Sequence, residues 1–356
     1  MSPLRIVHID SGQTWRGGQR QALLLALGLR LRGHEPFLIG FPECPLAGRA
    51  RAAGLAVATI RMRADWDLRA AKKIRSRIHA WSADVVHAHD ARSHALAMLA
   101  LLGRRSVPLI VTRRVPFTPR SARLKYGDRV ARFIAISNAV RDAMVDGGID
   151  PARIDVVYSG IYLPALEVTA RDWRAELGWS ADTVLCGIVG AMTVEKGLDS
   201  LAAVARQIPA EIAARMRLVL LGGTAAGMRD IAGIPAYYAG FIEDIEPAMA
   251  GLDLLLHPSR TEGLGTAVLD AMALGVPPVA FATGGIPEVI TDQATGLLVP
   301  EGDLSGFAGA TGRLISDPDF RKTLGDAARI RAKSFDALEM TKGTEAVYNR
   351  VLRGWR

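Results

Sequence analysis

Two glycine-rich segments in the second half of the chain carry side chains that could bind an anion. Lys196 lies in segment 190–197, just before a predicted helix, where its ammonium group could pair with a phosphate. Glu262 lies in segment 258–270, which opens another predicted helix near Gly265. The unpaired N–H groups and the dipole of that helix start favour negative charge. These residues therefore predict a phosphate site with a carboxylate at its edge.

Thr266 and Asp270 are four residues apart and share one face of the second helix. Asp270 and Glu262 would then flank the phosphate site with two carboxylates. Carboxylates accept hydrogen bonds from neutral sugar hydroxyls, so the pairing suits a phosphorylated sugar. The alternative is that an acidic residue at this helix start only caps the helix.

In the first half, Gly17 and Gly18 follow the first predicted strand and precede a helix predicted over 21–32. Adjacent glycines let a backbone approach a ligand closely, and the helix start again favours an anion. A plain turn between strand and helix explains the same pattern.

Two histidines, His87 and His89, lie near the end of the fourth predicted strand. Because they are two residues apart, they face the same side of the sheet. Three interpretations are open: His89 contacts substrate, it joins Asp90 or His94 in a metal site, or it is structural.

Short apolar segments that alternate with helix-length stretches must position these side chains. We predict strands at 5–9, 36–41, 57–60, 84–89, 109–112, 133–136, 155–158, 184–189, 217–221, 236–239, 252–257, 278–281 and 296–299. Several are continuously apolar, which is typical of a parallel sheet covered on both faces. The predicted fold class is α/β, with two doubly wound, Rossmann-like domains joined by a linker over 160–169. Ligands are expected at the carboxyl ends of the strands.

Composition bounds the class of protein. The chain has 356 residues, of which 49% are hydrophobic and 22% charged, so it is globular and long enough for two domains. No apolar run reaches the roughly 20 residues that a membrane span needs. Two cysteines cannot form a disulfide framework, and the first ten residues lead directly into a strand rather than a signal peptide. We therefore expect a reducing cytoplasm.

Charge is distributed unevenly between the two halves. Residues 1–165 hold 26 Lys and Arg against 12 Asp and Glu, whereas residues 166–356 hold 18 against 24. The basic half is expected to face something anionic. The sequence shows no zinc-ligand cysteine pairs and no interleaved aromatic platform, so nucleic acid is not the predicted partner.

Nearly the whole chain resembles the retaining glycosyltransferases of family 4, which have the two-domain GT-B fold. The resemblance rests on Gly17-Gly18, His89, residues 136–140, Lys196-Gly197, and residues 262–270, 284–288 and 295–300. It implies an acceptor-binding domain over 1–165 and a donor-binding domain over 166–338. It also implies that 339–356 forms a helix that packs back on the first domain.

The resemblance further implies roles for single residues. Lys196 would pair with the donor diphosphate, Glu262 would contact the donor sugar, and His89 would contact the transferred sugar; these are the predicted catalytic residues. The other predicted donor-binding residues are Gly17, Gly18, Ile242, Gly263, Leu264, Gly265, Thr266 and Asp270.

Two positions depart from the family pattern. Asp270 stands where the family usually has Glu, and Ala191 stands where many members have an arginine near the diphosphate. The missing charge could come from one of three other arginines, Arg16, Arg114 or Arg260.

No metal and no cofactor beyond the nucleotide-sugar co-substrate are expected. The leaving group would be a nucleoside diphosphate, whose charge Lys196 and the helix amides could stabilise. Asp65-Trp66-Asp67 has the D-x-D form that metal-dependent glycosyltransferases use, but it precedes a basic helix. We therefore predict a surface turn there.

Basic residues cluster at 61–77, with Trp66 and Trp81 near the ends, and again at 113–132. Because the chain has 37 Arg and 7 Lys, an arginine-rich solvated surface is one interpretation. The other is a docking face for anionic lipid or a lipid-linked glycan. We expect a bacterial enzyme, peripheral at the inner face of the cytoplasmic membrane, that makes lipopolysaccharide or another cell-surface glycan.

The expected donor is a UDP- or GDP-sugar and the expected acceptor a glycan or lipid-linked glycan. Two alternatives stay open at this stage. One is a GT-B epimerase that acts on a nucleotide sugar, and the other is a non-catalytic relative that binds nucleotide or glycan.

Overall fold

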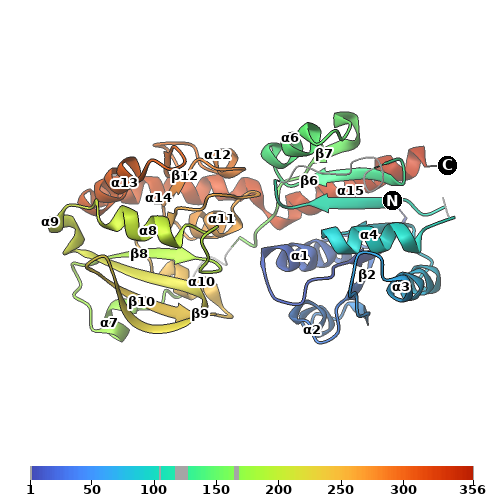
Figure 1. Cartoon of the computed structure of the whole chain (residues 1–356), viewed down its shortest axis with the longest axis horizontal. Helices are drawn as coiled ribbons and strands as arrows, with labels where there is room; N and C mark the ends of the chain where they lie inside the picture. The colour runs from blue at the N-terminus through green and yellow to red at the C-terminus, as the bar shows by residue number, and fades with distance from the viewer. Residues whose placement is uncertain (1, 104–105, 117–126, 164–167, 356) are drawn as a thin grey trace. The chain divides into compact units, whose positions relative to one another are not determined.

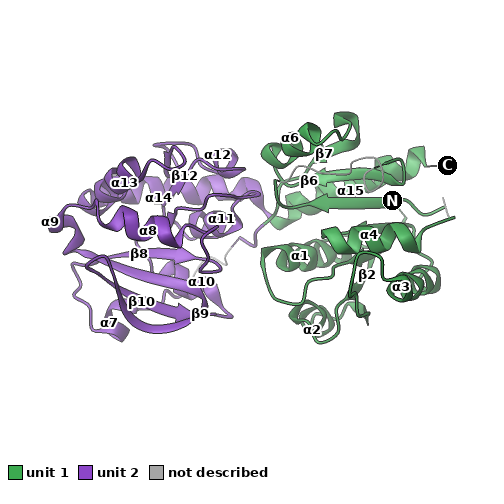
Figure 2. Ribbon diagram, viewed as in Figure 1, with its two compact units in different colours: residues 1–160, 337–356 green, residues 161–336 purple. Residues whose placement is uncertain are grey.

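The computed structural model describes residues 2–103, 106–116, 127–163 and 168–355, and the chain divides into two compact units (Figures 1 and 2). Unit 1 comprises Met1–Gly160 and Ala337–Arg356, and unit 2 comprises Ile161–Asp336. The sequence placed these boundaries after residues 165 and 338. Part of the predicted linker, 164–167, and part of the second basic cluster, 117–126, lie outside the described residues.

Unit 1 is built on a parallel seven-stranded sheet of order β3-β2-β1-β4-β5-β6-β7. Its strands are β1 (Arg5–Ile9), β2 (Glu35–Gly40), β3 (Ala56–Thr59), β4 (Val85–Ala88), β5 (Leu109–Arg113), β6 (Val130–Ala135) and β7 (Ile154–Val156). Its helices are α1 (Gly17–Leu31), α2 (Pro45–Ala52), α3 (Leu68–Ala80), α4 (Ala91–Ala100), α6 (Asn138–Asp146) and α15 (Ala337–Gly354). The strand order reverses between β1 and β4, so this is where a doubly wound sheet binds ligands.

The last helix of the chain, α15, packs in unit 1 beside α1 (Figure 2). The two helices come close at Gly28, where an added Cβ would lie 2.2 Å from Thr341 Oγ1. Both bury apolar side chains against the sheet residues Ile6, Val85, Ile110 and Ile134. The helix begins at Ala337, two residues before the predicted start at residue 339.

Unit 2 is built on a six-stranded sheet of order β10-β9-β8-β11-β12-β13. Its strands are β8 (Val184–Val189), β9 (Met216–Ile231), β10 (Ile234–Gly240), β11 (Leu254–His257), β12 (Pro278–Phe281) and β13 (Leu297–Val299). Its helices are α7 (Trp173–Leu177), α8 (Leu198–Ala205), α9 (Ala210–Ala213), α10 (Ile245–Ala250), α11 (Thr266–Ala273), α12 (Ile286–Val289), α13 (Leu304–Ser316) and α14 (Pro318–Ala332). Here the order reverses between β8 and β11. The predicted fold class, two Rossmann-like α/β domains, is confirmed.

One edge of the unit 2 sheet differs from the prediction of parallel strands joined by helices. Strand β9 continues to Ile231, ten residues beyond the predicted end. Its first part, 218–222, pairs with β10 in parallel register, as predicted, whereas its extension, 226–231, pairs with β10 antiparallel. Only Ala232 and Gly233 connect the two strands, and both have positive φ, 54° and 86°. Two such residues make a hairpin turn, whereas a parallel connection needs a crossover of a dozen or more residues.

A second difference concerns the start of α1. The sequence predicted a loop containing Gly17 and Gly18 before a helix from Gln21, but the helix begins at Gly17. Both glycines therefore occupy its first turn, and the N-cap residue, Arg16, makes no side-chain capping bond.

The segment with Asp65, Trp66 and Asp67 is a turn, as predicted. Asp67 caps α3, because its carboxylate accepts a hydrogen bond from Ala70 N at 2.9 Å. In the part of the chain that the structure describes, no helix has both the length and the apolar character to cross a bilayer.

Candidate functional site

In unit 2, two loops meet at the carboxyl ends of β8 and β11, where the strand order reverses. Gly197 ends the first loop with φ 76° and caps α8, and its Cα lies so close to the second loop that an added Cβ would be 1.9 Å from Pro258 O. Arg260 N in turn donates to Glu195 O at 3.0 Å. Only glycine fits this contact, so it fixes where the neighbouring Lys196 projects.

Lys196 and Glu262, which the sequence placed in one site, are in direct contact. The Lys196 ammonium donates to Glu262 Oε1, and His257 Nε2 lies 3.0 Å from the same oxygen. The side chains of Glu262 and His257 are 10% and 4% exposed, while that of Lys196 is 34% exposed. Lys196 is therefore the member of the trio that a ligand can reach most easily.

The Glu262 carboxylate is strongly held in its charged form. Burial by itself would raise its pKa, but the hydrogen bond from His257 and the charges of His257 and Lys196 outweigh burial. Together they lower the pKa from 4.5 to about 2. His257 was not among the residues predicted from the sequence. Its place at the end of β11, five residues before Glu262, was the available signal.

The remaining residues predicted for this segment follow Glu262 into α11. Gly265 is the N-cap, with φ 90°, and Thr266 is the first helical residue. Leu264 is buried, and Asp270 is half-buried one turn farther along. No side chain caps the helix and its first turn holds no acidic residue, so the positive end of its dipole is uncompensated there.

Ile242 belongs to a third loop at the same edge of the sheet. Gly240 at the end of β10 lies opposite Gly222 of β9, and an added Cβ on Gly222 would be 2.2 Å from Gly190 O. Ile242 follows two residues later and is half-buried. A small pocket beside Lys196 is lined by Ile188, Val189, Gly190, Ala191, Met192, Gly197, Leu198, Leu201 and Pro258.

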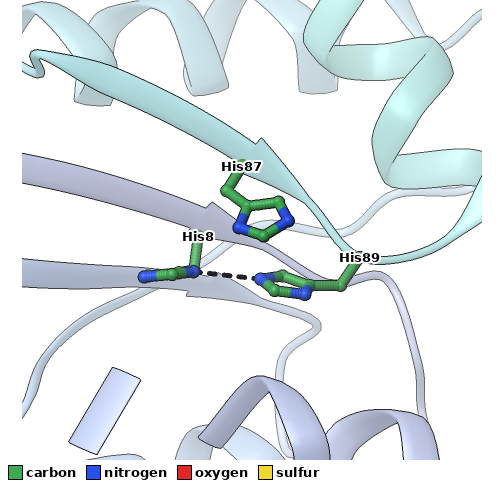
Figure 3. A group of neighbouring side chains, drawn as sticks. All are labelled: His8, His87 and His89. Carbon is green, nitrogen blue, oxygen red and sulfur yellow. Dashed lines mark hydrogen bonds between the residues drawn. The ribbon is translucent and has the colours of Figure 1, made fainter. Parts of the chain in front are cut away.

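In unit 1, His89 lies at the end of β4 in a buried group of ring nitrogens (Figure 3). His89 Nε2 faces His8 Nδ1 at 2.9 Å, and Arg114 Nη2 lies 3.1 Å from His89 Nδ1. His87 is close by, with its ring centroid 4.3 Å from that of His89, as expected if both histidines face one side. His8, which comes from the neighbouring strand β1, was not among the predicted residues.

Burial and charge keep these rings neutral. Burial, and after it the neighbouring Arg114 charge, lower the pKa of His8 to about 3. The pKa values of His87 and His89 are also lowered well below the ordinary histidine value, chiefly by burial. Burial likewise lowers the pKa of Arg114 to about 10, although the charges of Asp10 and Asp90 oppose the change.

The metal interpretation of this region has a specific candidate. Among the described residues, His8, His87 and His89 bring ligand atoms within 4.8 Å of one another. A metal on His89 Nε2 would require a proton on Nδ1, where Arg114, which can only donate, already lies. Both ring nitrogens of His87 are hydrogen-bonded as well, Nδ1 to Tyr348 Oη at 2.6 Å and Nε2 to Thr112 Oγ1 at 2.7 Å. These contacts favour a hydrogen-bonded cluster.

Asp90 and His94, which the sequence suggested as further metal ligands, make other contacts in the structure. Asp90 caps α4, and its two oxygens accept hydrogen bonds from Ser11, Arg92 and Ser93. His94 is buried, and its ring meets the edge of Phe133 at a centroid distance of 6.3 Å.

The three arginines considered as a replacement for the missing charge differ in their contacts. Arg260 pairs with Asp199 at an exposed position in unit 2. Arg114 bonds His89 in unit 1, and its stem passes over Gly18, whose added Cβ would lie 3.6 Å from Arg114 Cδ. Arg16 is exposed at the start of α1. Arg16 and Arg114 thus belong to unit 1, and Arg260 belongs to unit 2.

Comparisons with known proteins agree with this architecture. Residues 15–163 match the model of "Glycosyltransferase Family 4", and residues 183–317 match that of "Glycosyl transferases group 1". A D-inositol 3-phosphate glycosyltransferase of Mycobacteroides abscessus is 30% identical over 311 residues, which are 77% of this chain and 67% of that protein. The sulfoquinovosyl transferase SQD2 of Arabidopsis thaliana is 26% identical over 80% of this chain and 60% of its own length.

Solved structures show the same fold. Anabaena HepE in complex with UDP and glucose superposes with a TM-score of 0.83 at 20% identity, covering 98% of this chain and all of HepE. The lipopolysaccharide outer core galactosyltransferase WaaB superposes with a TM-score of 0.72 at 16% identity, covering 98% of this chain and all of WaaB. With two Rossmann-like units, matches to the family models in both halves and a relative that is 30% identical, this chain belongs to the family 4 glycosyltransferases of GT-B fold.

Proposed function

We propose that the protein transfers a sugar from a nucleoside-diphosphate sugar, UDP- or GDP-linked, to a glycan or lipid-linked acceptor with retention at the anomeric carbon. The bond between that carbon and the diphosphate oxygen breaks, and a bond to the acceptor oxygen forms. The acceptor's proton passes to the departing phosphate, so no protein base is required. HepE is solved with UDP, which favours the uridine nucleotide.

The observation that carries the proposal is the Lys196 group of unit 2. An accessible ammonium, a buried carboxylate and the uncapped start of α11 lie at the point where the sheet order reverses. A diphosphate suits the ammonium and the helix amides, and Glu262 suits sugar hydroxyls. The Lys196 ammonium and the N–H groups of the helix start would stabilise charge on the leaving diphosphate without a metal.

The test is thermal stabilisation of the full chain by UDP, GDP, ADP, CMP and the corresponding sugars, with and without EDTA. A ligand at 100 times its Kd should stabilise unit 2 by about 2.7 kcal/mol. We expect one nucleoside diphosphate to act without metal, and Lys196→Met to abolish the effect. Lys322→Met, which removes a lysine paired on the exposed face of α14, is the matched control. No stabilisation by any nucleotide would contradict the proposal.

We also propose that unit 1 binds the anionic inner face of a bacterial cytoplasmic membrane, where lipid-linked acceptors for lipopolysaccharide or other surface glycans are made. The turn before α3 and the first residue of that helix expose two apolar side chains, Trp66 (78% exposed) and Leu68 (70% exposed). Exposed basic residues surround them in sequence: Arg61, Arg63, Arg69, Lys72, Lys73 and Arg77. The other tryptophan near this basic segment, Trp81, packs within the protein instead, because its ring stacks on that of Phe37 with a centroid distance of 4.7 Å.

Each basic residue near an anionic leaflet contributes about 1 kcal/mol to the binding free energy, and the exposed side chains of Trp66 and Leu68 add apolar contact with the lipid. We expect the protein to sediment with anionic vesicles and not with zwitterionic ones, and salt to release it. Trp66→Ser should weaken binding, whereas Ile330→Ser, at an apolar position on α14 that is 68% exposed, should leave it unchanged. Equal binding by both variants would count against this surface.

A further inference from the structure

The hydrogen bonds around His89 determine where its proton lies. Arg114 has only N–H donors, so His89 Nδ1, 3.1 Å from Arg114 Nη2, must be the acceptor. In a neutral imidazole the other nitrogen then carries the proton. His89 Nε2–H therefore donates to His8 Nδ1, 2.9 Å away (Figure 3).

The tautomer of His89 in turn determines the tautomer of His8. Because His8 Nδ1 accepts, the His8 proton lies on Nε2. This nitrogen is buried and has no hydrogen-bond partner in the described part of the chain. Arg114 thus sets the tautomers of two histidines on neighbouring strands.

Two nearby carboxylates act electrostatically on the Arg114 guanidinium. Asp10 and Asp90 are the acidic groups that act on it. Both carboxylates are themselves anchored: Asp10 accepts from Gly12 N at 2.8 Å and Gln19 Nε2 at 3.0 Å, and Asp90 caps α4. From β4 and α15, His87 and Tyr348 complete the set of titratable groups around the rings.

We propose that Arg114 and His8 are positioning residues that hold His89 as a neutral ring with its proton on Nε2. Both ring nitrogens of His89 are then engaged within the protein. His89 therefore offers no nitrogen for proton transfer, and it presents a fixed, neutral ring at the end of β4. The functional part of this inference rests on the proposed transferase activity.

The first test needs no substrate. Long-range 1H–15N spectra of the full chain labelled at its seven histidines report which ring nitrogens are protonated, and His8 and His89 variants assign the signals. We expect Nδ1 of both His8 and His89 to be unprotonated from pH 8 to pH 5. A proton on His89 Nδ1, or an ordinary titration of either ring near pH 6.5, would overturn the proposal.

Variants separate Arg114 from general structural effects. In Arg114→Met we expect the tautomer with the proton on Nδ1 to appear in both rings together. The two rings share one hydrogen bond, so when His89 Nε2 becomes the acceptor, His8 Nδ1 must become the donor. Arg114→Lys, which still can only donate, should restore the wild-type pattern. Arg92→Met is the control: Arg92 lies on α4 and bonds Met62 O, so its removal should change neither ring. An unchanged pattern in Arg114→Met would refute the role of Arg114.

Turnover gives the second readout. Arg114→Met should lower kcat roughly 10- to 100-fold, the loss typical of a misplaced group, while nucleotide stabilisation of unit 2 stays intact. Loss of that stabilisation would show Arg114 to be a donor ligand instead and would overturn the proposal. If the wild type has no transferase activity, the proposed function fails, and the spectra still decide the tautomer.

Discussion

Replacing Glu262 by Gln tests the electrostatics of the unit 2 site most directly. Gln resembles the protonated carboxyl in shape but cannot become charged. A carboxyl whose pKa falls from 4.5 in the unfolded chain to about 2 in the folded one stabilises the fold above pH 4.5. That stabilisation is lost as the pH falls through the folded pKa.

The magnitude follows from these two pKa values. At pH 7 their difference corresponds to about 3 kcal/mol, since one pKa unit is about 1.4 kcal/mol. At pH 3 the folded carboxyl is still mostly charged and the unfolded one is mostly protonated, which leaves about 1.4 kcal/mol. Glu262→Gln should therefore cost about 3 kcal/mol of unfolding free energy at pH 7 and less than half of that at pH 3.

The assay is urea unfolding at several pH values, monitored through 5-fluorotryptophan at Trp173. This side chain is fully buried in unit 2 and donates to Ala248 O at 2.8 Å, so its resonance reports that unit. Titrations of groups that do not interact with Glu262 cancel when the variant is subtracted from the wild type. A stability difference that is absent at pH 7, or that does not change between pH 7 and pH 3, would refute the reasoning.

Three further perturbations test packing. Gly197→Ala adds a Cβ 1.9 Å from Pro258 O at a positive φ and should destabilise unit 2 by more than about 2 kcal/mol. The control Gly178→Ala, at φ 65° with nothing within 4 Å of the added Cβ, should cost only the roughly 1 kcal/mol of its backbone conformation. The midpoints of urea unfolding compare the two variants. Tyr348→Phe leaves His87 Nδ1 without its partner at 2.6 Å and should cost about 1–3 kcal/mol, and a variant as stable as the wild type would show that this bond contributes nothing. Cys44 and Cys186 are both buried, and burial raises the pKa of Cys186. Neither thiol should therefore react with Ellman's reagent at pH 8 until the protein unfolds. A rapid reaction of the native chain would contradict this packing.

Much of the fold could be predicted because its signals are local. Val184–Val189 and Pro278–Phe281 are continuously apolar, which is how a strand buried on both faces must look, and the structure has strands with these bounds. The turn at Asp65–Asp67 was predictable because it stands between polar residues and a basic helix. Lys196 and Glu262 were likewise found from loops that each follow a buried strand, since the ends of neighbouring parallel strands share one edge of a sheet.

Only the tertiary structure decided which groups touch. His8 and His89 are 81 residues apart, and nothing local to either predicts that their nitrogens face each other at 2.9 Å. Arg114 could have faced a ligand or solvent until the ends of β4 and β5 placed it against His89. The extension of β9 over Gly222–Ile231, poor in strand-forming residues, depends on its pairing with β10. The sequence alone determined most of the elements and the family, because burial patterns and turn residues are local features of a sequence. Hydrogen bonds, pKa values and the extension of β9 depend on distances that only the packed sheets define.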